Sequence, residues 1–167
     1  CKKGQLKNGV DLGGPVLFSK LIKQNPEIKR KLIATVKNDY FDTEFGYEFL
    51  YETSLQLLKN KNKLLTLGGD HSISCGTVPA FYDMFRENGT VVWIDAHADI
   101  NTPETSTTGN LHGMPVASAF NLMKPIVKAE YQPNFEQIIY VGLRSVDPPE
   151  KKILDKYGIL YFDNKDI

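Results

Sequence analysis

Short apolar runs alternate with longer amphipathic stretches along this chain, which is the pattern of βαβ units around a parallel sheet. The apolar runs predict strands at Leu32–Val36, Leu64–Leu67, Thr90–Ile94, Ile138–Val141 and Ile159–Phe162. Helical spacing of apolar residues, with Pro and Gly at the boundaries, predicts helices over Phe45–Lys59, Gly76–Asn88 and Pro148–Tyr157. Gly89 fits a left-handed cap after the second helix, and Gly158 follows the third. The fold class is therefore α/β.

Composition sets the broad class of protein. With 167 residues, of which 41% are hydrophobic and 24% charged, we expect one globular domain over residues 1–167. The 20 Lys and Arg residues balance 20 Asp and Glu residues, so no excess positive charge favours nucleic acid or an anionic membrane as a partner. No run of about 18 apolar residues and no signal-peptide core occur, which favours a cytoplasmic protein.

The ends and the cysteines add two smaller expectations. The chain begins at Cys1 rather than Met and stops just after a strand-like run, so we expect the domain to be an incomplete piece of a longer protein. Cys75 lies in no CxxC pair and in no recognisable thiol-activation motif. We interpret it as a reduced residue that packs in the interior.

The segment with the most chemical information follows the strand predicted at Thr90–Ile94. Asp95, His97 and Asp99 occupy alternate positions, so an extended backbone would turn them to one side at the strand's carboxyl end. Carboxylates and an imidazole this close need a compensating cation, and an O/N ligand set suits Mn²⁺, Mg²⁺ or a similar divalent ion. The alternative is that they only cap the strand and hydrogen-bond the following loop, Asp99–Leu111.

The second segment, LTLGGDHS, is again a strand that ends in polar residues. It brings His71 to the same edge if the two strands are neighbours, which makes His71 an additional metal ligand. Asp70 and Ser72 would cap the following helix or orient the imidazole. Taken alone, a histidine after a strand is more often a structural residue, but its coincidence with the Asp/His cluster favours the ligand.

Two further segments carry polar residues after predicted elements. His112 lies between glycines in a loop, where an imidazole that titrates near neutral pH can shuttle protons; the alternative is a helix N-terminus near Asn110 or His112. Asp147 either binds an ammonium group or, together with Glu150, caps the helix that begins there. No P-loop, GxGxxG or GxSxG motif occurs, so nucleotide binding and serine-esterase chemistry have no support.

Four motifs in order along the chain resemble those of the arginases, in the ureohydrolase family: GGDHS (Gly68–Ser72), DAHADIN (Asp95–Asn101), GNLHGMP (Gly109–Pro115) and GLRSVDP (Gly142–Pro148). The resemblance implies an arginase-like, three-layer αβα fold with a central parallel sheet, truncated in this chain. It also implies a hydrolase, usually a homotrimer, that converts L-arginine to L-ornithine and urea with a pair of Mn²⁺ ions.

The resemblance implies a role for each candidate residue. His71 and Asp99 would ligate one ion, His97 the other, and Asp95 would bridge both. A water between the ions would become hydroxide near neutral pH and attack the guanidinium carbon. His112 would be the proton shuttle. The remaining residues would bind the amino-acid end of the substrate, its α-carboxylate by Asn101, Thr108 and Asn110 and its α-ammonium by Asp147.

The chain departs from the family pattern in three ways. Thr108 stands where arginases commonly have Ser, which keeps a hydroxyl, and Ser145 stands where many have an acidic residue, which removes a charge. The family's later DxD-type motif and a later Glu have no counterpart before Ile167. We therefore expect roughly the first half of an arginase, with too few ligands to hold two ions well and inactive by itself.

Two alternatives remain beside arginine hydrolysis. One is a ureohydrolase that acts on agmatine or another guanidino compound, although agmatine has no carboxylate for the residues assigned to that group. The other is a truncated, catalytically silent protein that retains a metal-binding or subunit-interaction surface. Assays of arginine beside agmatine, with Mn²⁺ at saturation, separate these hypotheses.

Overall fold

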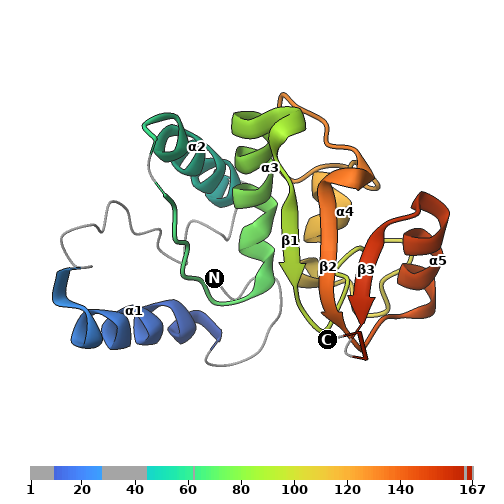
Figure 1. Ribbon diagram of the computed structural model, residues 1–167, viewed down its shortest axis with the longest axis horizontal. Coiled ribbons are helices and arrows are strands. Elements are labelled where there is room, and N and C mark those ends of the chain that lie inside the picture. Colours follow the sequence, from blue (N-terminus) through green and yellow to red (C-terminus); the bar gives the residue numbers. More distant parts are fainter. Residues whose placement is uncertain (1–9, 28–44, 62, 164, 167) are drawn as a thin grey trace.

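A three-stranded parallel sheet forms the centre of the computed structural model, which describes residues 10–27, 45–61, 63–163, 165 and 166. Its strands are β1 (Val91–Ile94), β2 (Ile138–Leu143) and β3 (Leu160–Asp163), in that spatial order (Figure 1). The register pairs Val91 with Ile138 and slips near Gly142, whose φ is 87°. This irregularity lies at the carboxyl end of β2, where a bulge redirects the chain.

The helices of the described residues are α1 (Gly13–Gln24), α2 (Phe45–Lys59), α3 (Ser74–Phe85), α4 (Pro115–Ala119) and α5 (Pro148–Tyr157). Helices α1 to α3 precede the strands, and α4 and α5 connect them. Helices α2 and α5 have the predicted bounds. Helix α3 begins two residues earlier than predicted and ends at Phe85, and a 3-10 turn, Arg86–Asn88, follows it. None of the helices in the described ranges is long and apolar enough to cross a membrane.

One face of the sheet carries the main hydrophobic core. Tyr82 of α3, Val116 of α4 and Leu154 of α5 pack there against Trp93 and Tyr140, which point to that face from β1 and β2. All five side chains are at most 5% exposed. The helices that flank and connect the strands therefore form one layer on one side of the sheet, and the predicted α/β class with a parallel sheet is confirmed.

The opposite face of the sheet is apolar and open in the described part of the chain. Alternation along the strands turns Val92, Ile94, Leu160 and Phe162 to that face, and they are 55%, 78%, 52% and 42% exposed. Of the three layers that the αβα prediction contains, the described residues thus provide the sheet and one helical layer.

Two of the predicted strands differ in outcome from the other three. Leu32–Val36 lies outside the described residues. Leu64–Leu67 is not a strand, because no neighbouring strand pairs with its backbone in the described ranges. The start of α1 packs against this segment instead: a β-carbon placed on Gly14 would lie 3.1 Å from the Leu67 carbonyl oxygen. An apolar run of this length becomes a strand only where a partner takes its hydrogen bonds.

The helix ends follow local chemistry, with one correction. Gly158 ends α5 with a φ of 60°, the left-handed conformation that glycine adopts without strain. The left-handed cap expected at Gly89 is wrong. Arg86 takes the positive φ, 49°, and Gly89 is extended. Position 89 favours glycine because the surrounding side chains leave no room for a larger residue: a β-carbon there would lie 2.9 Å from the ring of Phe81.

Cys75 is fully buried in a second cluster, where α2 packs on α3. Burial, helped by the charge of Asp70, raises the pKa of the Cys75 thiol to about 12. The thiolate is the reactive form of cysteine. We therefore expect a thiol-specific reagent to leave Cys75 unmodified in the native protein and to label it after unfolding in guanidinium, as mapped by mass spectrometry. Labelling at equal rates in both states would contradict this packing.

Candidate metal centre

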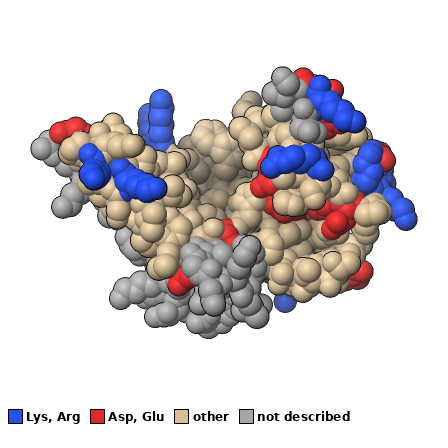
Figure 2. All heavy atoms as spheres, turned by 90° about the horizontal axis from the view of Figure 1, so that it is seen from below, with Lys and Arg blue, Asp and Glu red and all other residues tan. Residues whose placement is uncertain are grey.

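A pocket of about 580 Å³ opens at the carboxyl ends of β1 and β2. Open α/β sheets place their ligands at this edge. Figure 2 views the molecule from below and shows acidic atoms exposed on this face. The pocket is lined by every residue singled out from the sequence as a site residue, together with several others: Gly69, Asp70, His71, Asp95, His97, Asp99, Asn101, Ser106, Thr107, Thr108, Asn110, His112, Gly113, Asp147 and Glu150.

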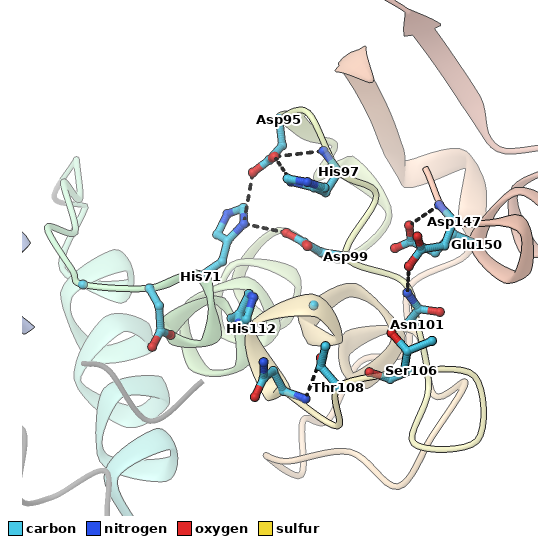
Figure 3. Close-up of a pocket in the computed structure, with 15 residues that line it drawn as sticks. His71, Asp95, His97, Asp99, Asn101, Ser106, Thr108, His112, Asp147 and Glu150 are labelled. Carbon is cyan, nitrogen blue, oxygen red and sulfur yellow. Dashed lines mark hydrogen bonds and ion pairs between the residues drawn. The ribbon is translucent and has the colours of Figure 1, made fainter. Parts of the chain in front are cut away.

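A compact group of potential ligands lies at one end of this pocket. His71 Nδ1 is 2.6 Å from Asp99 Oδ2 and 3.2 Å from Asp95 Oδ2 (Figure 3). One ligand atom from each of the three residues lies within 4.8 Å of the others, so they can share one ion. Two carboxylate oxygens and an imidazole nitrogen form a donor set that fits a divalent cation such as Mn²⁺, with no thiolate to select a softer metal.

The loop after β1 positions both carboxylates. Asp95 continues the hydrogen bonding of the strand by one residue, because its N–H donates to the Val141 carbonyl at 3.2 Å. Asp99 has a φ of 49°, and its carbonyl accepts from the Val116 N–H at 3.1 Å, which ties the loop to the start of α4. The loop is further held where the buried Tyr140 hydroxyl donates to the Ala98 carbonyl at 2.8 Å.

A short 3-10 turn, His71–Ile73, delivers the imidazole from the other direction. Asp70 caps this turn as expected, since its Oδ1 accepts from the Ser72 N–H at 2.9 Å. The Tyr47 hydroxyl of α2 donates to Ser72 Oγ at 3.1 Å. His71 therefore reaches the cluster through a capped turn anchored to α2, although the segment before it is not a paired strand.

The carboxylates set the protonation of His71. Burial disfavours the charged imidazole, but the hydrogen bond to Asp99 and the negative charges of Asp99, Asp95 and Asp70 outweigh it, so the pKa of His71 is raised above its usual value. When His71 is protonated, its positive charge compensates the carboxylates. A metal ion would take over that compensation and release the proton.

His97 lies beside this group but not in it. The backbone bends after Ile94, so the alternation expected through Asp95, His97 and Asp99 does not continue as an extended strand. The His97 side chain is 59% exposed, and its Nδ1 lies 3.4 Å from Asp95 Oδ1. Asp95 thus presents Oδ2 to His71 and Oδ1 to His97, with one imidazole at each oxygen.

The opposite end of the pocket is formed by polar side chains from different loops. In Figure 3 Asn101, Asp147 and Glu150 lie together, away from the metal-ligand group. Asn101 Nδ2 donates to Asp147 Oδ2 at 3.2 Å, and Asn101 Oδ1 accepts from Thr105 Oγ1 at 2.9 Å. This end of the pocket combines a carboxylate with an amide that is already oriented.

Glu150 connects the two ends of the pocket through the backbone. It is 3% exposed, its Oε1 accepts from the Ile100 N–H at 3.2 Å, and its Oε2 accepts from the Asp147 N–H at 3.0 Å. Burial raises the pKa of Glu150, although these backbone hydrogen bonds lower it. The helix-capping alternative for this segment is therefore correct, because Asp147 is the N-cap of α5 and forms a capping box with Glu150. Glu150 also fixes the loop that follows Asp99.

The wall between the ends carries the glycine-flanked segment. Thr108 Oγ1 accepts from the Asn110 N–H at 3.3 Å, and Asn110 precedes the 3-10 turn Leu111–Gly113 that holds His112. Figure 3 shows His112 on the same side of the pocket as His71. Sequence reasoning assigned no role to Ser106 and Thr107, which also line this wall. They lie in the aperiodic loop, whose position after a strand was the only signal for them.

Fold and site together define a metal-binding α/β protein. The arginase family matches residues 11–167, and the chain belongs to that family. It is 43% identical to the arginase of Neurospora crassa over 120 residues, which is 65% of this chain and 34% of the relative. Human arginase-1 is 33% identical, with coverage of 99% of this chain and 58% of the human protein.

Solved arginase structures have the same fold. That from Bacillus caldovelox superposes with a TM-score of 0.83 at 28% identity, over 99% of this chain and 62% of that chain. That from Entamoeba histolytica, solved in complex with L-ornithine, gives 0.80 at 30% identity with the same coverage. The chain therefore spans from about a third to about three fifths of the length of these relatives.

Proposed function

We propose that this chain carries part of the active site of a manganese-dependent arginase, which hydrolyses L-arginine to L-ornithine and urea. The observation that carries the proposal is one pocket with a His/Asp/Asp ligand group at one end and the polar side chains of Asn101 and Asp147 at the other. Membership of the arginase family supports it. The ornithine complex of the Entamoeba histolytica relative supports an amino-acid substrate.

In this proposal the ligand group holds Mn²⁺. His71, Asp95 and Asp99 would contact one ion, and His97 would contact a second ion through the other side of Asp95, whose two oxygens already face the two imidazoles. Bound there, the ions would supply a water of lowered pKa as the nucleophile for hydrolysis of a guanidinium group near neutral pH. His71 must lose its proton before it can bind an ion, and because its pKa is raised, metal binding should strengthen as the pH rises.

The remaining residues orient the substrate and move protons. His112 faces the pocket beside the ligand group and would transfer a proton to the leaving amine. Asn101, Thr108 and Asn110 would bind the α-carboxylate, and Asp147 would bind the α-ammonium. The residues assigned to the α-carboxylate favour arginine over agmatine, which lacks that group, and all of them line the pocket.

The partners and location complete the proposal. We propose a homo-oligomer, a trimer by resemblance to other arginases, in the cytoplasm. Neutral net charge, at 20 basic against 20 acidic residues, supports a small-molecule substrate rather than nucleic acid or a membrane surface.

The decisive experiment measures urea release by the complete protein from arginine and from agmatine, with and without Mn²⁺. Release from arginine that requires Mn²⁺ supports the proposal. If the protein releases urea faster from agmatine, the substrate in the proposal is wrong and is a guanidino compound without a carboxylate. Mn²⁺ binding without urea from either compound would identify a silent metal-binding protein and overturn the enzymatic proposal.

Asn110→Ala tests recognition of the carboxylate. We expect it to lower kcat/KM for arginine by about 10- to 100-fold, the effect of one hydrogen bond to a charged group, while any slow agmatine hydrolysis stays unchanged. The backbone N–H that donates to Thr108 remains in the variant, so the loop should keep its shape. Asn60→Ala, at an exposed position just after α2, is the matched control. Equal losses with both substrates would contradict carboxylate binding by Asn110.

A further inference from the structure

The indole of Trp93 stacks on the imidazole of His71. The ring centroids are 4.4 Å apart and the planes differ by 27°. Trp93 is the single tryptophan of the sequence, lies on β1 and is 5% exposed, whereas the His71 side chain is 36% exposed. The stack therefore joins a buried ring of the core to a partly exposed imidazole at the pocket surface.

The other contacts of the His71 ring differ from this one. Its Nδ1 meets Asp99 Oδ2 and Asp95 Oδ2, and these three atoms are the ones that can share an ion. When an ion is bound, the ligand atoms face the ion rather than one another. The stack uses the face of the ring and not its nitrogens, so it can restrain the ring both with and without metal.

Trp93 is not explained by core packing alone. Its indole Nε1 is buried and has no hydrogen-bond partner among the described residues. A buried donor left unpaired lowers stability, and a phenyl ring at this position would bring no such donor. A large flat ring at this position does, however, restrict the orientation of the His71 imidazole that stacks on it.

We propose that Trp93 is a positioning residue of the metal centre, which holds His71 in the orientation that presents its nitrogen to the same point as the carboxylates of Asp95 and Asp99. The inference rests on the metal site of the proposed function. Pre-orientation of the ligand lowers the entropy lost when the ion binds, so Trp93 raises metal affinity through His71 without touching the ion.

The test measures Mn²⁺ affinity of the complete protein by isothermal titration calorimetry. Trp93→Leu, which removes the flat ring, should weaken binding about tenfold, as expected when a residue that orients a ligand is lost. Trp93→Phe keeps an aromatic face and should bind within about threefold of the wild type. Phe120→Leu is the matched control, because this 4% exposed aromatic packs on Tyr82 and Phe135 and does not line the pocket.

A second readout does not need the leucine variant to fold. Mn²⁺ is paramagnetic, so its binding should quench the emission of Trp93, which lies one imidazole away from the ligand group. Trp93→Phe identifies the part of the emission that comes from Trp93. Unchanged emission in the wild type during saturation with Mn²⁺ would overturn the inference, as would equal affinities of Trp93→Leu and Phe120→Leu. A wild-type protein that binds no Mn²⁺ would instead overturn the proposed function together with this role.

Discussion

Replacing Asp99 by Asn is expected to abolish urea release and to weaken Mn²⁺ binding by more than about 100-fold. Loss of a residue that only hydrogen-bonds a metal ligand weakens binding by roughly 10- to 100-fold, and loss of a ligand should cost more. The Asp99 carboxylate belongs to the group that can share an ion, and it lies 2.6 Å from His71 Nδ1. An amide has nearly the same shape but no charge, so one anionic ligand is lost. The measurement is Mn²⁺ affinity by calorimetry beside turnover of arginine.

The fold should survive this substitution, so that a loss of metal is not mistaken for unfolding. The φ of Asp99 is 49°, and Asn tolerates that conformation about as well as Asp does. The matched control is Asp83→Asn, a buried carboxylate that accepts from the backbone N–H groups of Glu130 and Tyr131, away from the pocket. We expect Asp83→Asn to lower the melting temperature and to keep metal affinity. Normal Mn²⁺ binding by Asp99→Asn would remove Asp99 from the ligand set.

Helices with local boundary signals were predictable from the sequence. Helix α5 begins at Pro148 and ends before Gly158, and both signals act within one turn of the chain. The Leu64–Leu67 prediction failed for the opposite reason, because a strand depends on a partner that the local sequence does not specify. Gly89 shows the same limit, since its role comes from the approach of Phe81 and not from its own φ.

The candidate site was predictable in its members but not in its geometry. Alternation suggested that Asp95, His97 and Asp99 form one row, whereas the chain bends after Ile94 and His71 joins Asp95 and Asp99 instead. This arrangement of the three side chains depends on two tertiary contacts. One ties the loop after β1 to α4, and the other anchors the turn that holds His71 to α2. Trp93 had a local signal, because it lies two residues before Asp95 on the same strand face, but that position alone does not show a stack on His71.

The exposed sheet face agrees with the three layers that the family resemblance implies. Strands of a parallel sheet are apolar on both sides because helices normally cover both faces. Val92 and Ile94 follow that rule in sequence and are nevertheless 55% and 78% exposed in the described part of the chain. The apolar pattern therefore predicts a helical layer on each face, and the described residues provide the one on the side of Trp93 and Tyr140.

Removal of the His112 imidazole should separate catalysis from metal binding. His112 lines the pocket on the side of His71 but is not in the group that can share an ion. We expect His112→Ala to lower kcat for arginine by about 10²- to 10⁴-fold, the usual contribution of a positioned acid or base. Mn²⁺ affinity should stay unchanged. Asp99→Asn is the comparison, because it should lose metal as well as turnover.

External imidazole distinguishes a proton shuttle from a residue that only shapes the pocket. The deletion leaves space at an open wall of the 580 Å³ pocket, so a small base can enter and supply the missing proton transfer. Turnover of His112→Ala should therefore rise with imidazole concentration, and the same addition should leave the wild type and Asn110→Ala unaffected. If kcat falls in parallel with Mn²⁺ occupancy and imidazole restores nothing, His112 supports the metal centre and another group moves the proton.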